Sequence, residues 1–371
     1  MPRDRRHCLP LRQGAAPPGP GTRSTAISAT SEDARLEQLA RWLSGLSNPA
    51  GLDPRSLRPA SSDASFRRYF RVDAGAAGAS FIAMDAPPPR EDCRPFVQVA
   101  ALMAAAGVAT PRIVAHELDQ GFLLLQDFGD TTYADAQLRD PAGTARRYDD
   151  ALRCLVRLQG ADPGPALPAY DAPRLLAEMR LFPEWYVARH LGAALSAAEH
   201  QSLEAVFGQL VDAALAQPRV LVHRDFHCRN LMVLPGPDNP GVLDFQDAVL
   251  GPVSYDLVSL LRDAYVEWPE AQQIDWAARY WDLARGAGIA LPLRFDAFWQ
   301  DLEWMGLQRS LKVLGIFARL YHRDGKSRYL ADLPLVLRHT QRVLERYDAF
   351  APLARLFDRL HERRRETGYR F

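Results

Sequence analysis

The pattern of hydrophobic and polar positions changes twice along the chain. Residues 1–30 are rich in Arg, Pro, Gly and Ala and carry no apolar periodicity, which predicts a disordered extension. Apolar side chains then recur at helical spacing, with Thr30 or Ser31 placed to cap the predicted helix. Residues 57–126 show short β-type runs separated by turns, and long amphipathic helical segments dominate from residue 129 onward.

The β-type part predicts a small sheet. Residues 57–89 contain three runs rich in aromatic and β-branched side chains, joined by turns of small residues and ended by prolines. A helix is expected at about 95–106, and a hairpin is expected from strands at 113–117 and 122–126. These elements form a mostly antiparallel sheet with one inserted helix.

The remaining sequence predicts a helical lobe with a small β insert. The predicted helices cover residues 141–160, 172–191, 196–216, 254–266, 270–287, 295–320 and 331–347. Short β-type runs lie at 220–222, 231–234 and 241–245. We therefore expect an α+β fold of two lobes, with a sheet lobe over residues 31–128 and a helical lobe over residues 129–371.

Composition and charge narrow the class of protein. The 371 residues are 47% hydrophobic and 24% charged, with a net charge of zero, which is ordinary for a soluble globular domain. Nothing global attracts nucleic acid or an anionic membrane, and no obligate protein partner is evident. Four cysteines (Cys8, Cys93, Cys154 and Cys228) form no CxxC pair, which favours reduced thiols in a cytoplasmic protein. No apolar run approaches the ~20 residues of a membrane span.

The stretch LVHRDFHCRN, residues 221–230, carries the candidate chemistry. It places His223, Asp225 and Asn230 in a loop between two predicted strands, and Asp244 follows in GVLDFQD. Phosphoryl transfer requires a carboxylate that orients the acceptor hydroxyl, together with oxygen ligands for Mg²⁺. The spacing H-R-D-x-x-x-x-N supplies the carboxylate and an amide, and a later Asp supplies the second ligand. We predict Asp225 as the catalytic base and Asn230 and Asp244 as Mg²⁺ ligands.

Four neighbouring residues have less specific patterns. Asp247 fits a second metal contact, a substrate contact or a cap of the following turn. Asp256 begins an apolar helix, where it fits both a helix cap and a buried carboxylate that holds the catalytic loop through backbone hydrogen bonds. His227 and Cys228 are interpreted as packing residues.

With these motifs the chain resembles the aminoglycoside phosphotransferase and choline kinase branch of the protein-kinase-like superfamily, over residues ~35–350. A narrower resemblance, to the bacterial anomeric amino-sugar kinases of cell-wall recycling, rests on longer segments. They are SSDASFRRYFRV, FIAMDAPP, LLLQDFGD, LVHRDFHCRNLMVL, GVLDFQDAVLGPVSYDLVSLLRDAYVEW and QRSLKVLGIFARLYHRDGKSRYLADLP. This resemblance implies ATP-dependent phosphorylation of N-acetylmuramate and N-acetylglucosamine at C1, giving a sugar 1-phosphate for peptidoglycan recycling.

The resemblance also implies nucleotide contacts. The loop carrying Ser61, Ser62, Ser65 and Phe66 would lie over the phosphates, and the linker from Gln126 to Phe128 would face the adenine edge. Kinase-like folds place a Lys on the third strand, but this chain has Met84 there and no Lys before Lys312. Arg67 or Arg68 is therefore expected to bind phosphate instead. Their side chains point to opposite faces of a strand, so at most one of the two faces the nucleotide.

A sugar pocket is expected in the helical lobe above Asp225. The candidates for substrate binding are Glu178, Arg180, Asp247, Arg309 and Lys312. The lactyl carboxylate of N-acetylmuramate requires a cation, for which Arg309 or Lys312 is the hypothesis.

Two other functions remain open at this point. An aminoglycoside or amino-alcohol phosphotransferase of the same fold would need an acidic pocket for a cationic substrate, which the mixture of Arg180, Arg309 and Lys312 disfavours. A nucleotide-binding pseudokinase is supported only by the missing Lys.

Overall fold

The computed structural model describes residues 25–368 with short gaps. The gaps are residue 48, residue 50, 63–65, 76–77 and 164–166, and side chains are not described at 25–33, 61–62 and 362–368. The predicted disorder of residues 1–24 and the position of Cys8 lie outside the described residues. Cys93, Cys154 and Cys228 are free and buried.

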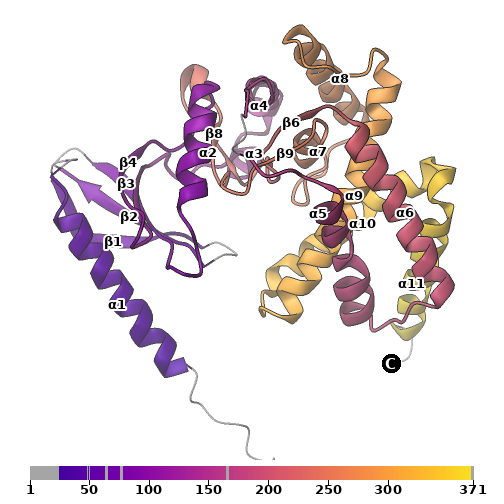
Figure 1. Ribbon diagram of the computed structural model, residues 1–371, viewed down its shortest axis with the longest axis horizontal. Helices are drawn as coiled ribbons and strands as arrows, with labels where there is room; N and C mark the ends of the chain where they lie inside the picture. The colour runs from indigo at the N-terminus through magenta and orange to yellow at the C-terminus, as the bar shows by residue number, and fades with distance from the viewer. Residues whose placement is uncertain are drawn as a thin grey trace, which may run out of the picture.

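The predicted antiparallel sheet is confirmed (Figure 1). Its strands, in the order β1-β2-β3-β5-β4, are β1 (Leu52–Ser62), β2 (Arg68–Ala74), β3 (Ala79–Asp85), β4 (Ile113–Glu117) and β5 (Phe122–Gln126). The hairpin of β4 and β5 has the bounds that the sequence predicts. Helix α2 (Arg94–Ala105) packs on one face of the sheet, and α1 (Thr25–Ser44) packs on the other. Alternate side chains of β5 supply the two cores: Leu124 faces α1, while Leu123 and Leu125 face the rest of the molecule.

Helix α1 begins earlier than expected. It starts at Thr25 and runs through Thr30 and Ser31, so the prediction that one of these two residues caps the helix is wrong. An ion pair attaches α1 to the sheet, because Arg35 contacts the fully buried carboxylate of Asp85 and donates to the Gln120 carbonyl at 2.9 Å.

The linker after β5 is tied back to β2. The Arg71 guanidinium contacts Asp127 at 2.5 Å and Asp130 at 2.7 Å, and the Ser80 hydroxyl donates to Asp127 at 2.7 Å. Burial alone would raise the pKa of Asp127, but the hydrogen bonds from Arg71 and Ser80 hold it below its ordinary value. The division of the chain into lobes at residue 128 stays a prediction, and this linker is where the sheet gives way to helices.

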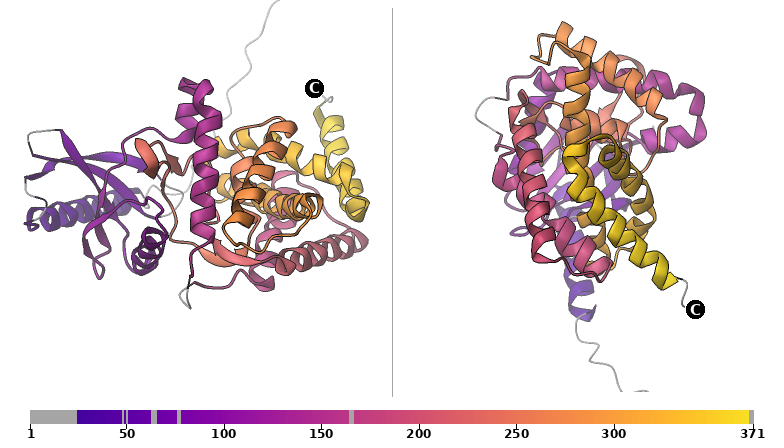
Figure 2. Two further views of the ribbon diagram at one scale, coloured as in Figure 1. Left: turned by 90° about the horizontal axis from the view of Figure 1, so that it is seen from above. Right: turned by 90° about the vertical axis from the view of Figure 1, so that its right-hand side faces the viewer.

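The second part of the chain is mainly helical, as predicted (Figure 2). Its helices are α3 (Tyr133–Arg139), α4 (Thr144–Gln159), α5 (Ala172–Met179), η3 (Phe182–His190), α6 (Ala197–Ala216), α7 (Tyr255–Leu261), α8 (Glu270–Gly286), α9 (Phe295–His322), α10 (Leu333–Arg346) and α11 (Ala351–Gly368). The β insert pairs β6 (Arg219–Val222) with β9 (Val249–Pro252), and β7 (Leu231–Met232) with β8 (Gly241–Val242). Sequence patterns did not predict α3, α11 or β9.

The predicted helix at 172–191 is two helices. Pro183 has no N–H to donate to Met179, so the regular α-helix ends there and the chain continues as the π-helix η3. Helix α9 passes directly beside this break. A Cβ atom on Gly315 would collide with the backbone of Leu181, so the glycine permits the close approach.

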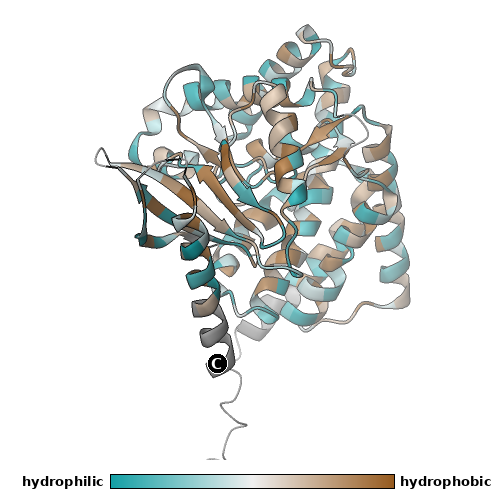
Figure 3. Ribbon diagram, turned by 60° about the vertical axis from the view of Figure 1, so that its left-hand side comes forward, coloured by the Kyte–Doolittle hydropathy of each residue, from teal (hydrophilic) through white to brown (hydrophobic). Residues whose placement is uncertain are grey.

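Hydrophobic side chains are concentrated in the strands and on the inner faces of the helices (Figure 3). In the part of the chain that the structure describes, no helix combines the length and the apolar character that crossing a bilayer requires.

Candidate active site

The loop from His223 to Asn230 connects β6 to β7 and is held by a buried carboxylate. The backbone N–H groups of His223 and Arg224 donate to the two carboxylate oxygens of Asp256, at 2.6 and 2.9 Å. Asp256 lies in the first turn of α7 and is fully buried. Arg224 adopts φ +78°, a conformation that costs a non-glycine residue free energy. Asp256 therefore stabilises the bend that presents Asp225, as the sequence predicted for this carboxylate.

Replacing Asp256 with Asn is expected to destabilise the fold, and by more at pH 5 than at pH 8. The amide offers one acceptor oxygen, so one buried N–H loses its partner, at about 1–3 kcal/mol. Burial raises the pKa of Asp256 to about 7, against the two N–H donors. Between about pH 4 and pH 7 the folded carboxyl keeps a proton that the unfolded one releases, so its contribution to stability falls as the pH rises. Urea unfolding of both proteins at the two pH values tests this, and an equal loss at both would show that Asp256 is ionised throughout.

His223 orients the loop from its other side. Its Nδ1 accepts from the Asp225 N–H at 3.2 Å, so Nε2 is assigned as the donor to the Leu243 carbonyl at 2.9 Å. Burial lowers the pKa of His223 to about 4, which keeps the ring neutral in this tautomer. One side chain thus connects the backbone at Asp225 to the residue that precedes Asp244.

The predicted base and metal ligands converge. The Asn230 side-chain amide donates to the Asp225 carbonyl at 3.0 Å and lies 3.5 Å from the Asp244 carboxylate. Because its NH₂ group bonds the loop, its carbonyl oxygen is the atom suited to a metal. Gln246 donates to Asp244 at 2.8 Å and to Asp247 at 3.2 Å, which orients the second ligand.

The donor set fits a magnesium ion that is shared with phosphates. One amide and one carboxylate oxygen are typical protein ligands for Mg²⁺, which takes its remaining ligands from water and substrate. A structural zinc site would need four enclosed ligands. Among the described residues, no group of three His, Cys, Asp or Glu side chains could hold a metal by itself.

Arg67 reaches the same site from the sheet lobe. Its guanidinium lies 3.2 Å from Glu91 and 3.9 Å from Asp244, and its side chain is only 10% exposed. Burial alone would lower the pKa of Arg67, but Tyr69, Glu91 and Asp244 raise it above its ordinary value. A permanent cation therefore sits beside the predicted metal ligand.

Arg68 lies on the opposite face of the sheet. It pairs across the strands with Asp85, to which it donates at 2.5 and 3.1 Å, and it stacks on Phe70. Asp85 also binds Arg35 of α1, so Arg68 belongs to the α1 side of the sheet. The expectation that Arg68 binds the nucleotide is wrong, because strand alternation directs its side chain away from the cleft.

The other nucleotide candidates are placed only in part. Ser65 lies outside the described residues, and Ser61 and Ser62 end β1 with side chains that are not described. Phe66 is exposed, and its N–H donates to Glu91 at 3.1 Å. Phe66 therefore lies beside the carboxylate that binds Arg67, which keeps the phosphate-loop hypothesis open.

The linker candidates differ from each other. The Gln126 N–H donates to the Arg112 carbonyl at 2.9 Å, so the expectation that it donates to adenine is wrong. Phe128 is half-buried, and its ring packs so closely on β8 that a Cβ on Gly241 would lie 2.6 Å from it.

Three of the substrate candidates lie together beneath the loop, and one lies elsewhere. Glu178 binds Arg224 at 2.5 Å and Lys312 at 3.4 Å, and Arg309 lies 3.7 Å from the Asp225 carboxylate. Arg180 is instead exposed and paired with Glu204 at 2.8 Å, so its assignment to the sugar pocket is wrong. It follows Met179, where α5 ends, and points outward.

Sequence reasoning missed several residues of the site. Glu91, which binds Arg67, stands in the irregular segment PPPRED, where no periodicity marks it. Gln246 was overlooked between two aspartates, although an amide beside a predicted metal ligand was a usable signal. Tyr170 and Tyr255, which bind Glu178 and Lys312, come from segments with no motif of their own.

Comparison with known proteins gives the class. The profile described as phosphotransferase enzyme family matches residues 56–290. A solved ethanolamine kinase from Plasmodium vivax has a similar fold, with a TM-score of 0.59 and 11% identity, over 82% of this chain and 87% of that one. The chain belongs to the phosphotransferase enzyme family, and its fold is the two-lobed one of the choline and aminoglycoside kinases.

Two curated relatives are more specific. A protein of Pseudomonas aeruginosa is 48% identical over 333 residues, covering 88% of this chain and 97% of that protein. A protein of Neisseria meningitidis is 44% identical over 340 residues, covering 91% of this chain and 99% of that protein. Both are named N-acetylmuramate/N-acetylglucosamine kinase, which confirms the narrower resemblance seen in the sequence.

Proposed function

We propose that this phosphotransferase uses ATP to phosphorylate the anomeric hydroxyl of N-acetylmuramate and N-acetylglucosamine. The single observation that carries the chemistry is the convergence of Asp225, Asn230, Asp244 and Arg67 from two lobes onto one site. The curated relatives support these sugars as acceptors. A cytoplasmic role in peptidoglycan recycling is part of the proposal.

Arg67 and the metal ligands form the donor side. Arg67 occupies the role that a strand lysine has in other kinases, and Glu91 holds its guanidinium in place as a carboxylate partner does there. Asn230 and Asp244 would hold Mg²⁺, which when bound neutralises charge on the phosphates. Arg67 lies close enough to Asp244 to contact phosphate oxygens bound to that ion.

Asp225 forms the acceptor side. Its carboxylate accepts a hydrogen bond from the anomeric hydroxyl, which fixes the direction of attack on the γ-phosphorus. The new C1–O–P bond forms as the bond from phosphorus to ADP breaks, and the hydroxyl proton passes to Asp225. The anomeric hydroxyl is the most acidic hydroxyl of the sugar, so a weakly basic carboxylate is sufficient.

³¹P NMR of the protein with Mg-ATP and each sugar separately tests the proposal. The expected product shows a phosphorus resonance coupled to the anomeric proton. Coupling to the C6 protons would retain the kinase and overturn the C1 assignment. Turnover of choline or an aminoglycoside, with neither sugar consumed, would overturn the sugar specificity.

A further inference from the structure

Helix α9 places two cations beneath the catalytic loop. Lys312 donates to the Tyr255 hydroxyl at 2.9 Å and lies 3.4 Å from Glu178. One turn earlier, Arg309 donates to the Arg224 carbonyl at 3.2 Å and lies 3.7 Å from the Asp225 carboxylate. Both side chains are buried, at 6% and 7% exposure. The reaction described above gives neither residue a part.

The internal partners of these cations argue against contact with the sugar. Glu178 already binds Arg224, Lys312 and the Tyr170 hydroxyl. Turning Lys312 toward a substrate would strip one partner from Glu178 and one from Tyr255 in a buried environment, which is costly. The same reasoning changes our interpretation of Glu178, which orients Arg224 and thereby the loop.

The charges around Asp225 are unequal. Arg224, Arg309 and Lys312 supply three cations, whereas Glu178 and Asp225 supply two carboxylates in the same cluster. The other titratable groups that influence Asp225 or are influenced by it are His223, His227, Tyr255, Asp256 and Tyr265. His223 is neutral, and the pKa of buried His227 lies below its ordinary value. The cations therefore exceed the carboxylates around the base.

We propose that Lys312 and Arg309 are positioning residues that keep Asp225 ionised and directed at the acceptor hydroxyl. This inference rests on the proposed function, because it assigns a role around the same base. Burial alone would raise the pKa of Asp225, but Lys312 and Arg309 hold it well below its ordinary range. An ionised Asp225 can accept the hydrogen bond, whereas a protonated one competes as a donor.

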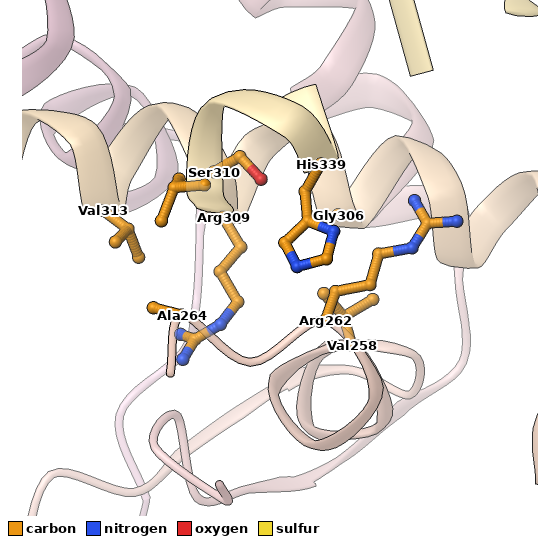
Figure 4. A pocket seen from close by; sticks show the side chains of 9 residues that line it. Val258, Arg262, Ala264, Gly306, Arg309, Ser310, Val313 and His339 are labelled. Atoms are coloured by element: carbon orange, nitrogen blue, oxygen red, sulfur yellow. The ribbon is translucent and has the colours of Figure 1, made fainter. Parts of the chain in front are cut away.

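Arg309 also lines a small pocket between α7, α9 and α10 (Figure 4). The pocket is further lined by Val258, Arg262, Ala264, Gly306, Ser310, Val313, Val336 and His339. Because space adjoins its side chain, Arg309 can be shortened to Gln with little repacking of the core. Arg309→Gln is therefore a usable second variant if Lys312→Met folds poorly.

The test is the pH dependence of kcat with N-acetylglucosamine. Lys312→Met is expected to move the acid limb up by about 1 pH unit, and Arg309→Gln by about 1–3 units, because each removes a cation near Asp225. Lys312→Arg restores the charge, so it is expected to return the limb toward that of the wild-type protein. Circular dichroism and urea unfolding confirm that each variant is folded.

Glu178→Gln is the matched control. It breaks the same ion pair as Lys312→Met but removes a negative charge, so its acid limb is expected to stay or move down. A merely structural role would make both variants lose activity without opposite shifts. Unchanged acid limbs in both Lys312→Met and Arg309→Gln would overturn the inference.

The two sugars separate this inference from direct substrate binding. N-acetylmuramate carries a lactyl carboxylate that N-acetylglucosamine lacks. If Lys312→Met raised KM about tenfold for N-acetylmuramate alone, Lys312 would be a ligand of that carboxylate and the positioning role would be wrong. If the wild-type protein phosphorylated neither sugar, the proposed function would fail first.

Discussion

Asp225→Asn is expected to lower kcat about 10³-fold for both sugars, while the KM for ATP changes less than threefold. The substitution keeps the size of the side chain but removes the charge that accepts the hydroxyl proton, a contribution typically worth 10²–10⁴-fold. The backbone contacts of the residue remain, since the Asp225 N–H bonds His223 and its carbonyl accepts from Asn230. Steady-state kinetics with a coupled ADP assay measures both constants.

Asp238→Asn is the matched control for this variant. It makes the same chemical change on the exposed turn that joins β7 to β8. Its kcat is expected to stay within twofold of the wild-type value. Activity of Asp225→Asn above a tenth of wild type would show that another group takes the proton and that the loop assignment is wrong.

Arg67→Ala is expected to lower kcat/KM for ATP by about 10²–10³-fold. Arg67 is the described cation beside Asp244 on the nucleotide face, whereas Arg71, which lies two residues after Tyr69, is bound to Asp127 and Asp130. Removing one preorganised electrostatic contact to the reacting group typically costs this much. Arg67→Lys keeps the charge and loses bidentate geometry, so its loss is expected to be smaller.

Arg68→Ala controls for position and for residue type. Its side chain binds Asp85 on the α1 face, so the variant is expected to lose stability and to keep kcat/KM for ATP within threefold. Equal kinetic losses in the Arg67 and Arg68 variants would mean that the sheet edge as a whole, and not Arg67, acts on the nucleotide.

Local patterns in the sequence were sufficient for the elements that depend on near neighbours. The β4–β5 hairpin was predicted with its bounds because alternating apolar residues flank a turn at Asp119–Gly121. Asp225, Asn230 and Asp244 were found because a tight loop between two short strands needs a fixed spacing. Helix α1 was started too late, since a possible capping residue does not end a helix that can continue past it.

Other parts of the site depend on contacts between distant segments. Strand alternation shows that Arg67 and Arg68 face opposite ways, but only the positions of Asp85 and Glu91 decide which one faces the nucleotide. Likewise, Arg180 and Glu178 are two residues apart, yet one is exposed and the other is buried under the loop. No local pattern distinguishes them, because the neighbours that bury Glu178 come from α9.

The sequence by itself thus determined the two-lobed class, the phosphotransferase loop and the resemblance to amino-sugar kinases. These rest on local periodicity and on motif spacing, which are properties of neighbouring residues. Only the tertiary structure decided that Arg67 replaces the missing strand lysine in position, and that Lys312 and Arg309 lie beneath Asp225. Those roles are set by electrostatic contacts between residues up to 177 positions apart in the chain, as for Arg67 and Asp244, and folding alone brings such groups together.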